Sequence, residues 1–368
     1  MEEHNIPGCG LIEGGNGRMI TKSYFPKELD LRISGRCVER DNLLYLCHSA
    51  SYVEFIFEGK YLAVELASEG GGEDFKAWMA VYINDMEVPY KKFSLEAGRK
   101  EYLLWENDTD EKVLVRLVKT SENQYAYAAI AKFILEERAK ITKTQAKQKH
   151  IQFIGDSITC GFGNEGNAGD AFLTQTENPL RAFAAMTAKK LDAEFTLISW
   201  SGIGIISSYV DPDVEVPNTG VLVPKLYPYT DYSLFARMGW EQEQYDFSKD
   251  TLDLIVINLC TNDSSYTREH AERQQAFFEE YVKFIGFLQK AYPKTPIVCC
   301  AGAMNRLLMT EVCKAAKTAS KADSMVYYYE FTPGIPEDGE GAVGHPSMVR
   351  HEKMAQELST WMKEQKLL

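Results

Sequence analysis

The sequence lacks an excess of basic residues and any long apolar run. Its 40 lysines and arginines are outnumbered by 53 aspartates and glutamates, which gives a formal net charge of −13 at pH 7. Nucleic-acid binders generally carry a basic patch, so this balance argues against a nucleic-acid partner. No apolar run approaches the roughly 18 residues that a membrane span needs, so we expect no membrane partner either.

Paired cysteine motifs, repeats and low-complexity tracts are also missing. The eight cysteines include no Cys-x-x-Cys pair. Several lie inside apolar runs, where a thiol behaves as a small hydrophobe, so we interpret them as buried free thiols. Residues 1–5 (MEEHN) lack the basic start and apolar core of a secretory signal, which predicts a cytoplasmic location, although a trimmed signal would leave the same sequence.

The chain of 368 residues is long enough for two domains, and its pattern changes once along its length. Short alternating or β-branched runs such as SYVEFIFEGKYLAVELAS fill the first part, and no long helix is expected before residue 136. Val53, Phe55 and Phe57 alternate with Glu54, which is typical of a strand with one wet face. We predict a jelly-roll-like β-sandwich over residues 1–137 and a solvated, lysine-rich linker over residues 138–149.

Strands and helices alternate strictly over residues 150–368. HIQFIG, FTLISW, LDLIVINL, PIVCCA and MVYYYEF read as strands that are apolar on both faces. Helices are expected over residues 178–191 with Asn178 as the cap, over 267–291, from about 310, and after Pro346. This pattern predicts a three-layer α/β domain with a parallel sheet, whose ligands bind beyond the carboxyl ends of the strands.

The residues that follow the strands carry the chemistry of a serine hydrolase. In chain order these groups are Gly155-Asp156-Ser157, Ser201-Gly202, Thr261-Asn262-Asp263 and, before the last helix, Gly344-His345-Pro346. A serine hydroxyl needs a base to become a nucleophile, and His345 is a candidate for that base. The N–H groups after Ser157, the N–H of Gly202 and the amide of Asn262 are candidate donors for an oxyanion hole.

These groups resemble the four blocks of the SGNH (GDSL-type) hydrolases. GDSITCGFG, SWSGIG, NLCTND and GHPS match those blocks in order, and the preceding β-domain is similar to that of carbohydrate esterase family 2. The resemblance implies that Ser157 is the nucleophile and first oxyanion donor, that Gly202 and Asn262 are further donors, and that His345 is the base. Asp156 would be structural. The Gly-x-Ser-x-Gly signature of α/β-hydrolases is absent, which disfavours that fold.

The sequence departs from the SGNH pattern at the acid that usually orients the histidine. The two positions where that aspartate is expected hold Val343 and Ala342. A backbone carbonyl can hold the same imidazole N–H, and some family 2 esterases are similar in working as Ser-His dyads. We therefore predict a dyad, with Glu340 and Asp338 as alternative acids.

Each candidate residue also has a purely structural interpretation. Ser157 can be a helix N-cap, Asn262 a turn residue and Gly202 a turn glycine. His345 can be a loop histidine, or half of a metal pair with His351. A six-residue spacing does not align two side chains on a helix face, so we predict no metal and no other cofactor.

The segment from Ser207 to Asp246 is long, polar and aromatic. Such loops are usually functional or disordered, and an aromatic platform near the nucleophile suits the C–H face of a sugar. Trp240 is the candidate for substrate binding, and packing at the domain junction is the alternative for all of these rings. The loop GFGNEGNAG after Ser157 is expected to be mobile and lacks the lysine of a phosphate-binding loop.

We therefore predict a carbohydrate O-acetylesterase that releases acetate from acetylated oligosaccharides through an acyl-enzyme on Ser157. In the cytoplasm its substrates would be importable oligosaccharides derived from mannan or xylan. The alternatives are a thioesterase or lysophospholipase of the same superfamily and a non-catalytic carbohydrate-binding protein. The sequence predicts neither the sugar, nor the hydroxyl position, nor the oligomeric state.

Overall fold

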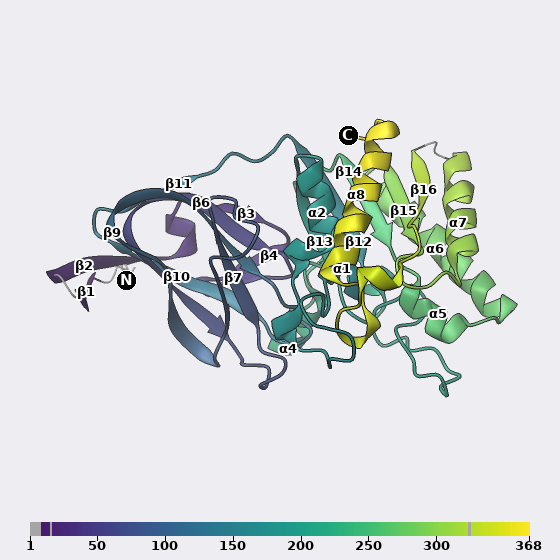
Figure 1. Cartoon of the computed structure of the whole chain (residues 1–368), viewed down its shortest axis with the longest axis horizontal. Helices are drawn as coiled ribbons and strands as arrows, with labels where there is room; N and C mark the ends of the chain where they lie inside the picture. Colours follow the sequence, from purple (N-terminus) through teal and green to yellow (C-terminus); the bar gives the residue numbers. More distant parts are fainter. Residues whose placement is uncertain (1–8, 15–16, 323–324) are drawn as a thin grey trace. The chain divides into compact units, whose positions relative to one another are not determined.

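Residues 9–14, 17–322 and 325–368 are described by a computed structural model (Figure 1). The chain divides into two units, one formed by residues up to 47 with 51–146 and the other by residues 48–50 with 147–368. The division at 146/147 falls within the segment 138–149 that the sequence suggests as a linker. Part of that segment, Lys140–Lys143, forms a strand of the first unit.

The first unit is an antiparallel sheet of 11 strands. Its central path runs β1-β2-β10-β6-β9-β7-β8, β3 and β11 pair with β6, β5 pairs with β10, and β4 pairs with β5. The strands are β1 (Cys9–Gly14), β2 (Gly17–Tyr24), β3 (Arg32–Ser34), β4 (Cys37–Arg40), β5 (Leu43–Leu46), β6 (Tyr52–Ser68), β7 (Trp78–Ile83), β8 (Lys91–Ser94), β9 (Gly98–Lys119), β10 (Ala128–Glu136) and β11 (Lys140–Lys143).

The sandwich is formed by this one continuous sheet, which curls over its own core (Figure 1). The register of β6 against β9 shifts between Gly59 and Tyr61, and such bulges bend a strand and increase its twist. Phe55, Phe57 and Phe133 are fully buried on the inner face. The prediction of a β-rich first domain without a long helix before residue 136 is thus confirmed for the described residues.

The expectation that Glu54 faces water is wrong. Its carboxylate is buried and accepts hydrogen bonds from Arg32, Arg116 and Thr144. Burial opposes ionisation, but the two guanidinium groups and the hydroxyl outweigh it and lower the pKa of Glu54. A period-two pattern marks the face of a strand, but it does not show whether arginines from other strands cover that face.

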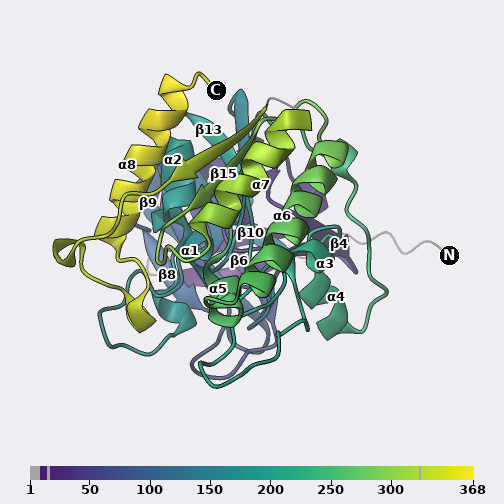
Figure 2. The ribbon, with the colours of Figure 1, turned by 90° about the vertical axis from the view of Figure 1, so that its right-hand side faces the viewer.

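The second unit is a five-stranded parallel sheet in the order β13-β12-β14-β15-β16. Figure 2 shows α2 and α8 on one face and α6 and α7 on the other. The strands are β12 (Lys149–Gly155), β13 (Ala193–Ser199), β14 (Leu254–Asn258), β15 (Ile297–Ala301) and β16 (Val326–Glu330). The helices are α1 (Ser157–Cys160), α2 (Phe183–Lys190), α3 (Val223–Leu226), α4 (Tyr232–Met238), α5 (Thr261–Thr267), α6 (Ala271–Ala291), α7 (Met309–Ala322) and α8 (Met348–Glu364).

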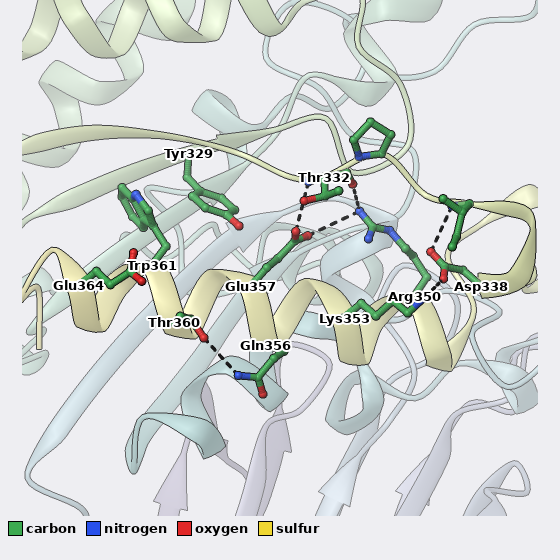
Figure 3. A pocket seen from close by; sticks show the side chains of 12 residues that line it. Tyr329, Thr332, Asp338, Arg350, Lys353, Gln356, Glu357, Thr360, Trp361 and Glu364 are labelled. Atoms are coloured by element: carbon green, nitrogen blue, oxygen red, sulfur yellow. Dashed lines mark hydrogen bonds and ion pairs between the residues drawn. The ribbon is translucent and has the colours of Figure 1, made fainter.

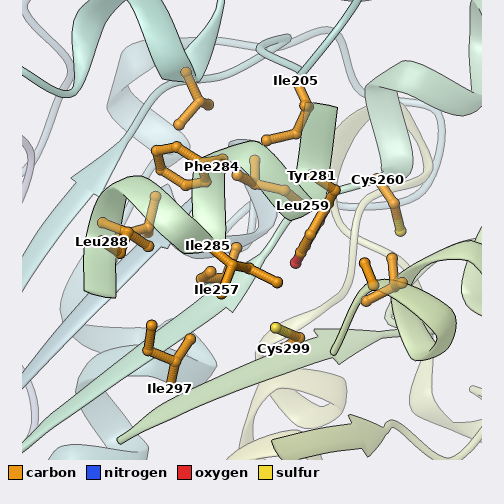
Figure 4. Packing of buried hydrophobic residues seen from close by; sticks show 14 of the residues in the cluster. Ile205, Ile257, Leu259, Cys260, Tyr281, Phe284, Ile285, Leu288, Ile297 and Cys299 are labelled. Atoms are coloured by element: carbon orange, nitrogen blue, oxygen red, sulfur yellow. The ribbon is translucent and has the colours of Figure 1, made fainter. Parts of the chain in front are cut away.

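Apolar side chains cover both faces of this sheet, as the three-layer prediction requires. On the α6 face, Ile257 and Cys299 of the sheet pack with Ile285 of α6 (Figure 4). On the other face, Phe153 packs in a cluster with Phe183 of α2 and with α8. The carboxyl ends of β12, β13 and β14 therefore meet at one edge of a sheet that is packed on both faces.

Several boundaries differ from the sequence-based expectation. Asn178 caps a short 3₁₀ turn, Pro179–Arg181, and the α-helix begins only at Phe183. The helix expected from residue 267 begins at Ala271, because Arg268 leaves helical geometry with φ 44° and ψ −139°. The segment 207–246, expected as one long loop, contains α3 and α4.

The cysteines with described side chains are all free, in agreement with the sequence interpretation. Five of these seven are buried, whereas Cys37 and Cys313 are partly exposed. The side chain of Cys9 and residues 1–8, on which the expectation about the start of the chain rests, lie outside the described residues. Within the described ranges, no helix combines the length and the apolar character that crossing a membrane requires.

Candidate active site

Ser157 and His345 meet at the carboxyl end of the parallel sheet. Ser157 is the first residue of α1, directly after β12, and its Oγ lies 2.9 Å from Nε2 of His345. The N-cap of α1 is Asp156, whose carboxylate accepts the N–H of Ile158 at 3.0 Å. The interpretation of Ser157 as the cap is therefore wrong, and its hydroxyl is directed to the histidine.

The place of the missing acid is occupied by a backbone carbonyl. Nδ1 of His345 lies 3.3 Å from the oxygen of Val343. Val343 has φ 54° and ψ 36°, a left-handed conformation that is rare for a β-branched residue. Asp338 instead binds Lys353, and Glu340 forms a backbone bridge with Pro346. Since a carbonyl can only accept, the imidazole carries its proton on Nδ1 and presents the Nε2 lone pair to the serine.

The glycine-rich loop after Ser157 holds the histidine loop in place. The N–H of Ala342 donates to the oxygen of Gly163 at 2.9 Å, and the N–H of Val343 donates to the oxygen of Asp170 at 3.1 Å. Gly163 has φ +60°, and a Cβ there would lie 2.7 Å from Cβ of Ala342. Glycine is required for this close approach. The loop expected to be mobile is therefore hydrogen-bonded to the segment that carries His345.

Burial favours the neutral, basic form of His345. Desolvation lowers the pKa of its imidazole, and hydrogen bonding to the backbone of Val343 and Ala342 offsets part of that effect. A pKa below the ordinary value of about 6.5 keeps the ring unprotonated at neutral pH. The histidine is then ready to accept the proton of the Ser157 hydroxyl.

Asn262 contacts Asp156, the residue before Ser157, and Gly202 lies in the loop after β13. Asn262 is buried on α5 and donates from Nδ2 to the oxygen of Ile203 at 2.8 Å, with a longer contact of 3.4 Å to Asp156. Gly202 has φ +79°, and a Cβ there would meet nothing within 4 Å. Its carbonyl accepts the N–H of Tyr209 at 2.8 Å. The side chain of Asn262 thus lies between the loop after β13 and Asp156, the residue that precedes Ser157.

Asp263 shapes this region without contacting the serine. Its carboxylate accepts N–H groups from Ile205 at 2.9 Å, Ile206 at 2.7 Å and Ser207 at 3.1 Å. Burial raises the pKa of Asp263 to about 6, although these hydrogen bonds work in the opposite direction. The interpretation of Asp263 as a structural acceptor agrees with this geometry.

The aromatic segment contributes mostly to the core. Tyr227 is fully buried and stacks on Phe247, within the second unit. Trp240 packs edge-on against Phe235, with ring centroids 5.4 Å apart, and its role in substrate binding stays a prediction. Sequence reasoning missed Tyr209, which is 53% exposed and bonded to Gly202. Its position a few residues after an oxyanion candidate is the signal that could have found it.

His351 serves a different purpose from His345. It is fully buried on α8, and its Nδ1 accepts the N–H of Phe183 at 3.1 Å. That N–H belongs to the first turn of α2, where backbone donors lack partners inside the helix. Desolvation lowers the pKa of His351 to about 3, so the ring is neutral. This histidine therefore caps the start of α2.

A groove of about 580 Å³ lies between β16 and α8, and neither Ser157 nor His345 lines it (Figure 3). Arg350 donates to the oxygen of Thr332 and lies 3.7 Å from Glu357. Lys353 donates to Asp338. These paired groups anchor the segment 332–338, from which the chain continues to the histidine.

Two family models match the chain. One, described as carbohydrate esterase 2 N-terminal, covers residues 33–160, and the other, described as the GDSL-like lipase/acylhydrolase family, covers residues 153–364.

Individual relatives agree with these matches. A cellulase/esterase of Acetivibrio thermocellus is 30% identical over 322 residues, which are 86% of this chain but only 37% of that protein. An acetylxylan esterase/glucomannan deacetylase of Cellvibrio japonicus is 24% identical over 91% of this chain and 88% of its own length. The solved structure of a family two carbohydrate esterase from Clostridium thermocellum with cellohexaose is 28% identical, with a TM-score of 0.80, over 92% of this chain and 100% of that one.

Proposed function

Because this chain belongs to the GDSL-like lipase/acylhydrolase family and carries a carbohydrate esterase 2 N-terminal domain, we propose that it is a carbohydrate O-acetylesterase working through a Ser-His dyad. The observation that carries the proposal is the contact of 2.9 Å between Ser157 Oγ and His345 Nε2 at the carboxyl end of the sheet.

Acyl transfer begins when Ser157 Oγ attacks the acetyl carbonyl while Nε2 of His345 takes the hydroxyl proton. The ester C–O bond then breaks, and the imidazolium returns the proton to the departing sugar oxygen. Water attacks the acetyl-serine in the same way, with His345 as base and then as acid, and acetate leaves. Throughout, Nδ1–H stays hydrogen-bonded to the carbonyl oxygen of Val343. This bond fixes the tautomer, as the acid does in a triad.

Three N–H donors suit the oxyanion that forms twice in this cycle. The N–H of Ser157 opens α1, the turn at Gly202 exposes another N–H, and Asn262 adds a side-chain amide. One amide hydrogen of Asn262 is committed to Ile203, and the long contact of 3.4 Å to Asp156 leaves the second available to the substrate oxygen.

The relatives and an exposed ring on the loop that contains Gly202 support the proposed substrate class. Proteins similar to this chain are named as esterases that act on acetylated xylan or glucomannan. We extend this to acetylated oligosaccharides derived from mannan or xylan. Tyr209, an exposed aromatic ring on the loop that contains Gly202, is suited to stack on the C–H face of a sugar.

Two other functions fit the fold less well. A thioesterase or lysophospholipase needs an apolar acyl channel. Apolar rings of the segment 207–246 such as Tyr227 and Phe235 are buried in the core and do not line such a channel. A non-catalytic carbohydrate-binding protein does not need a serine aligned with a histidine at hydrogen-bond distance.

The test is acetate release from acetylated manno- and xylo-oligosaccharides by the wild type, Ser157→Ala and His345→Ala. We expect release by the wild type and its loss in both variants, with unchanged melting temperatures. Absence of release by a folded wild type, combined with hydrolysis of long-chain thioesters or lysophospholipids, would overturn the proposal. Retained oligosaccharide binding without any hydrolysis would favour the binding protein.

A further inference from the structure

The imidazole of His345 lies against one ring of a stacked pair of phenylalanines. The ring of Phe162, on the loop directly after α1, has its centroid 4.3 Å from that of His345 with an interplanar angle of 37°. Phe162 in turn stacks on Phe172, with centroids 3.6 Å apart and an angle of 8°. The backbone of Phe162 is fixed as well, because its N–H donates to the oxygen of Ser157 at 3.0 Å.

His345 gains a positive charge in each half of the proposed reaction, and no described carboxylate contacts it. The carbonyl of Val343 orients the ring but carries only a dipole. An aromatic face within about 6 Å of a cation attracts it through the ring quadrupole, most strongly where water is excluded. The ring of Phe162 lies within that range of the imidazole. The attraction acts only when the histidine is protonated, because a neutral ring carries no net charge.

We propose that Phe162 is a positioning residue that replaces part of the missing acid, fixing the plane of the His345 ring and stabilising its imidazolium form, with Phe172 as its support. This inference rests on the proposed Ser-His mechanism and adds a residue to it. It explains why an acid is dispensable here: the carbonyl selects the tautomer, and the aromatic stack supplies attraction for the charge.

Other titratable groups around His345 do not provide that attraction. Asp156 before α1 is engaged by Ile158 and lies near Asn262 of α5. His351 of α8 is neutral, and its pKa is lowered by desolvation and by His345 itself. The remaining effects on His345 are burial and backbone hydrogen bonds.

The test compares Phe162→Leu with Phe162→Ala and Phe162→Tyr. Leucine keeps the apolar cover but removes the aromatic face, alanine admits water, and tyrosine keeps the face. Turnover of p-nitrophenyl acetate is measured against pH, and Phe287→Leu serves as the control because it removes aromatic contacts elsewhere in the same unit.

For Phe162→Leu we expect kcat to fall roughly tenfold with little change in KM, the size of a partly desolvated cation–π contact. The acid limb of the pH profile moves to lower pH, because the imidazolium has lost a stabilising contact. In Phe162→Ala the midpoint of the acid limb lies at a higher pH than in the leucine variant, because water entering the space solvates the imidazolium. Phe162→Tyr stays close to the wild type in both respects.

A separate readout does not depend on turnover. The pKa of His345 is followed by NMR in Ser157→Ala and in Ser157→Ala/Phe162→Leu, where the second protein should show the lower value. A leucine variant with wild-type kcat and an unmoved His345 pKa would overturn the inference. A wild type without esterase activity would refute the proposed function instead, while the NMR comparison would still test the aromatic contact.

Discussion

His345 and His351 are six residues apart in the sequence, yet the loop around the first and the helix around the second use the imidazole in opposite ways. In the loop, Nδ1–H of His345 donates to the carbonyl of Val343, so Nε2 faces Ser157 with its lone pair. In α8, Nδ1 accepts the N–H of Phe183, so the proton lies on Nε2. The backbone group beside Nδ1 selects the tautomer, and the tautomer decides whether Nε2 has a lone pair or a proton.

The largest effect is expected from replacing each histidine by alanine: one replacement should lower the rate and the other the stability. His345→Ala removes the proposed base, and we expect kcat to fall by about 10⁶, the size of the loss when a serine protease loses its catalytic histidine, with an unchanged melting temperature. His351→Ala leaves the Phe183 N–H without its acceptor and creates a cavity. It should lower the free energy of unfolding by about 2–4 kcal/mol and keep the kcat of the folded enzyme.

Both variants are assayed by initial rates and by chemical denaturation on the same preparation. A His351→Ala protein that is stable but inactive would show that the second histidine acts in the reaction, and the comparison would fail.

Asn262 and Asp263 are neighbours on α5, and we expect one to affect the rate and the other the stability. Asn262→Ala removes an oxyanion donor, so kcat should drop about 10²–10³-fold with little effect on KM. Asp263→Asn turns an acceptor of three N–H groups into an amide that repels at least one of them, which should cost about 1–3 kcal/mol of stability. Steady-state kinetics and urea unfolding distinguish the two, and equal losses of kcat in both variants would contradict the assignment.

The two histidines should also respond differently to pH. The acid limb of kcat/KM should have its midpoint below the ordinary histidine value of about 6.5, because burial lowers the pKa of His345. His351, with a pKa of about 3 in the folded state, binds its proton more readily when unfolded. Its stabilising effect is complete above about pH 6.5 and is lost as the pH falls towards 3.

Denaturation between pH 7 and pH 3.5 measures that loss, which a shift of this size limits to a few kcal/mol. His351→Asn offers an amide oxygen to the Phe183 N–H without titrating in this range, so its stability should vary less with pH. An identical pH dependence in the wild type and the asparagine variant would contradict the account of His351.

The smallest effect concerns the backbone at Val343. The left-handed conformation is unfavourable for valine, and its side chain is 56% exposed, so Val343→Gly loses little packing. We expect a gain in stability of up to about 1 kcal/mol, and kcat within about twofold because the carbonyl is retained. A large loss of kcat with normal stability would show that the valine side chain itself takes part.

The sequence predicted the parts of the site that follow strands, because parallel strands deliver their carboxyl ends to one edge. Ser157 and Asn262 could be placed in this way, as could the structural role of Asp263, whereas His345 was placed by its position before the last helix. The partner of His345 could not be found, since a carbonyl is present at every residue and only the φ of Val343 aims this one. Phe162 was hidden for a similar reason, because a ring after a helix gives no sign of what it faces.

The same contrast between local patterns and distant partners holds for the fold. Alternation of strands and helices predicted the layers of the second unit, whereas the start of α2 at Phe183 depends on His351 from a distant part of the chain. Period-two alternation predicted the strand through Glu54, and its burial depends on Arg32 and Arg116 from other strands. Local sequence patterns therefore predicted which helices and strands form. Residues distant in the sequence determined where some of these elements begin and which of their faces are exposed to water.

The most direct test of the dyad is to look for its covalent intermediate. The wild type is mixed rapidly with p-nitrophenyl acetate, quenched in acid, digested and analysed by peptide mass spectrometry. We predict an acetyl group on Ser157 that appears during turnover, disappears as the ester is consumed, and is absent from Ser157→Ala. Turnover without acetylation of Ser157, or with the acetyl group on another residue, would contradict the account.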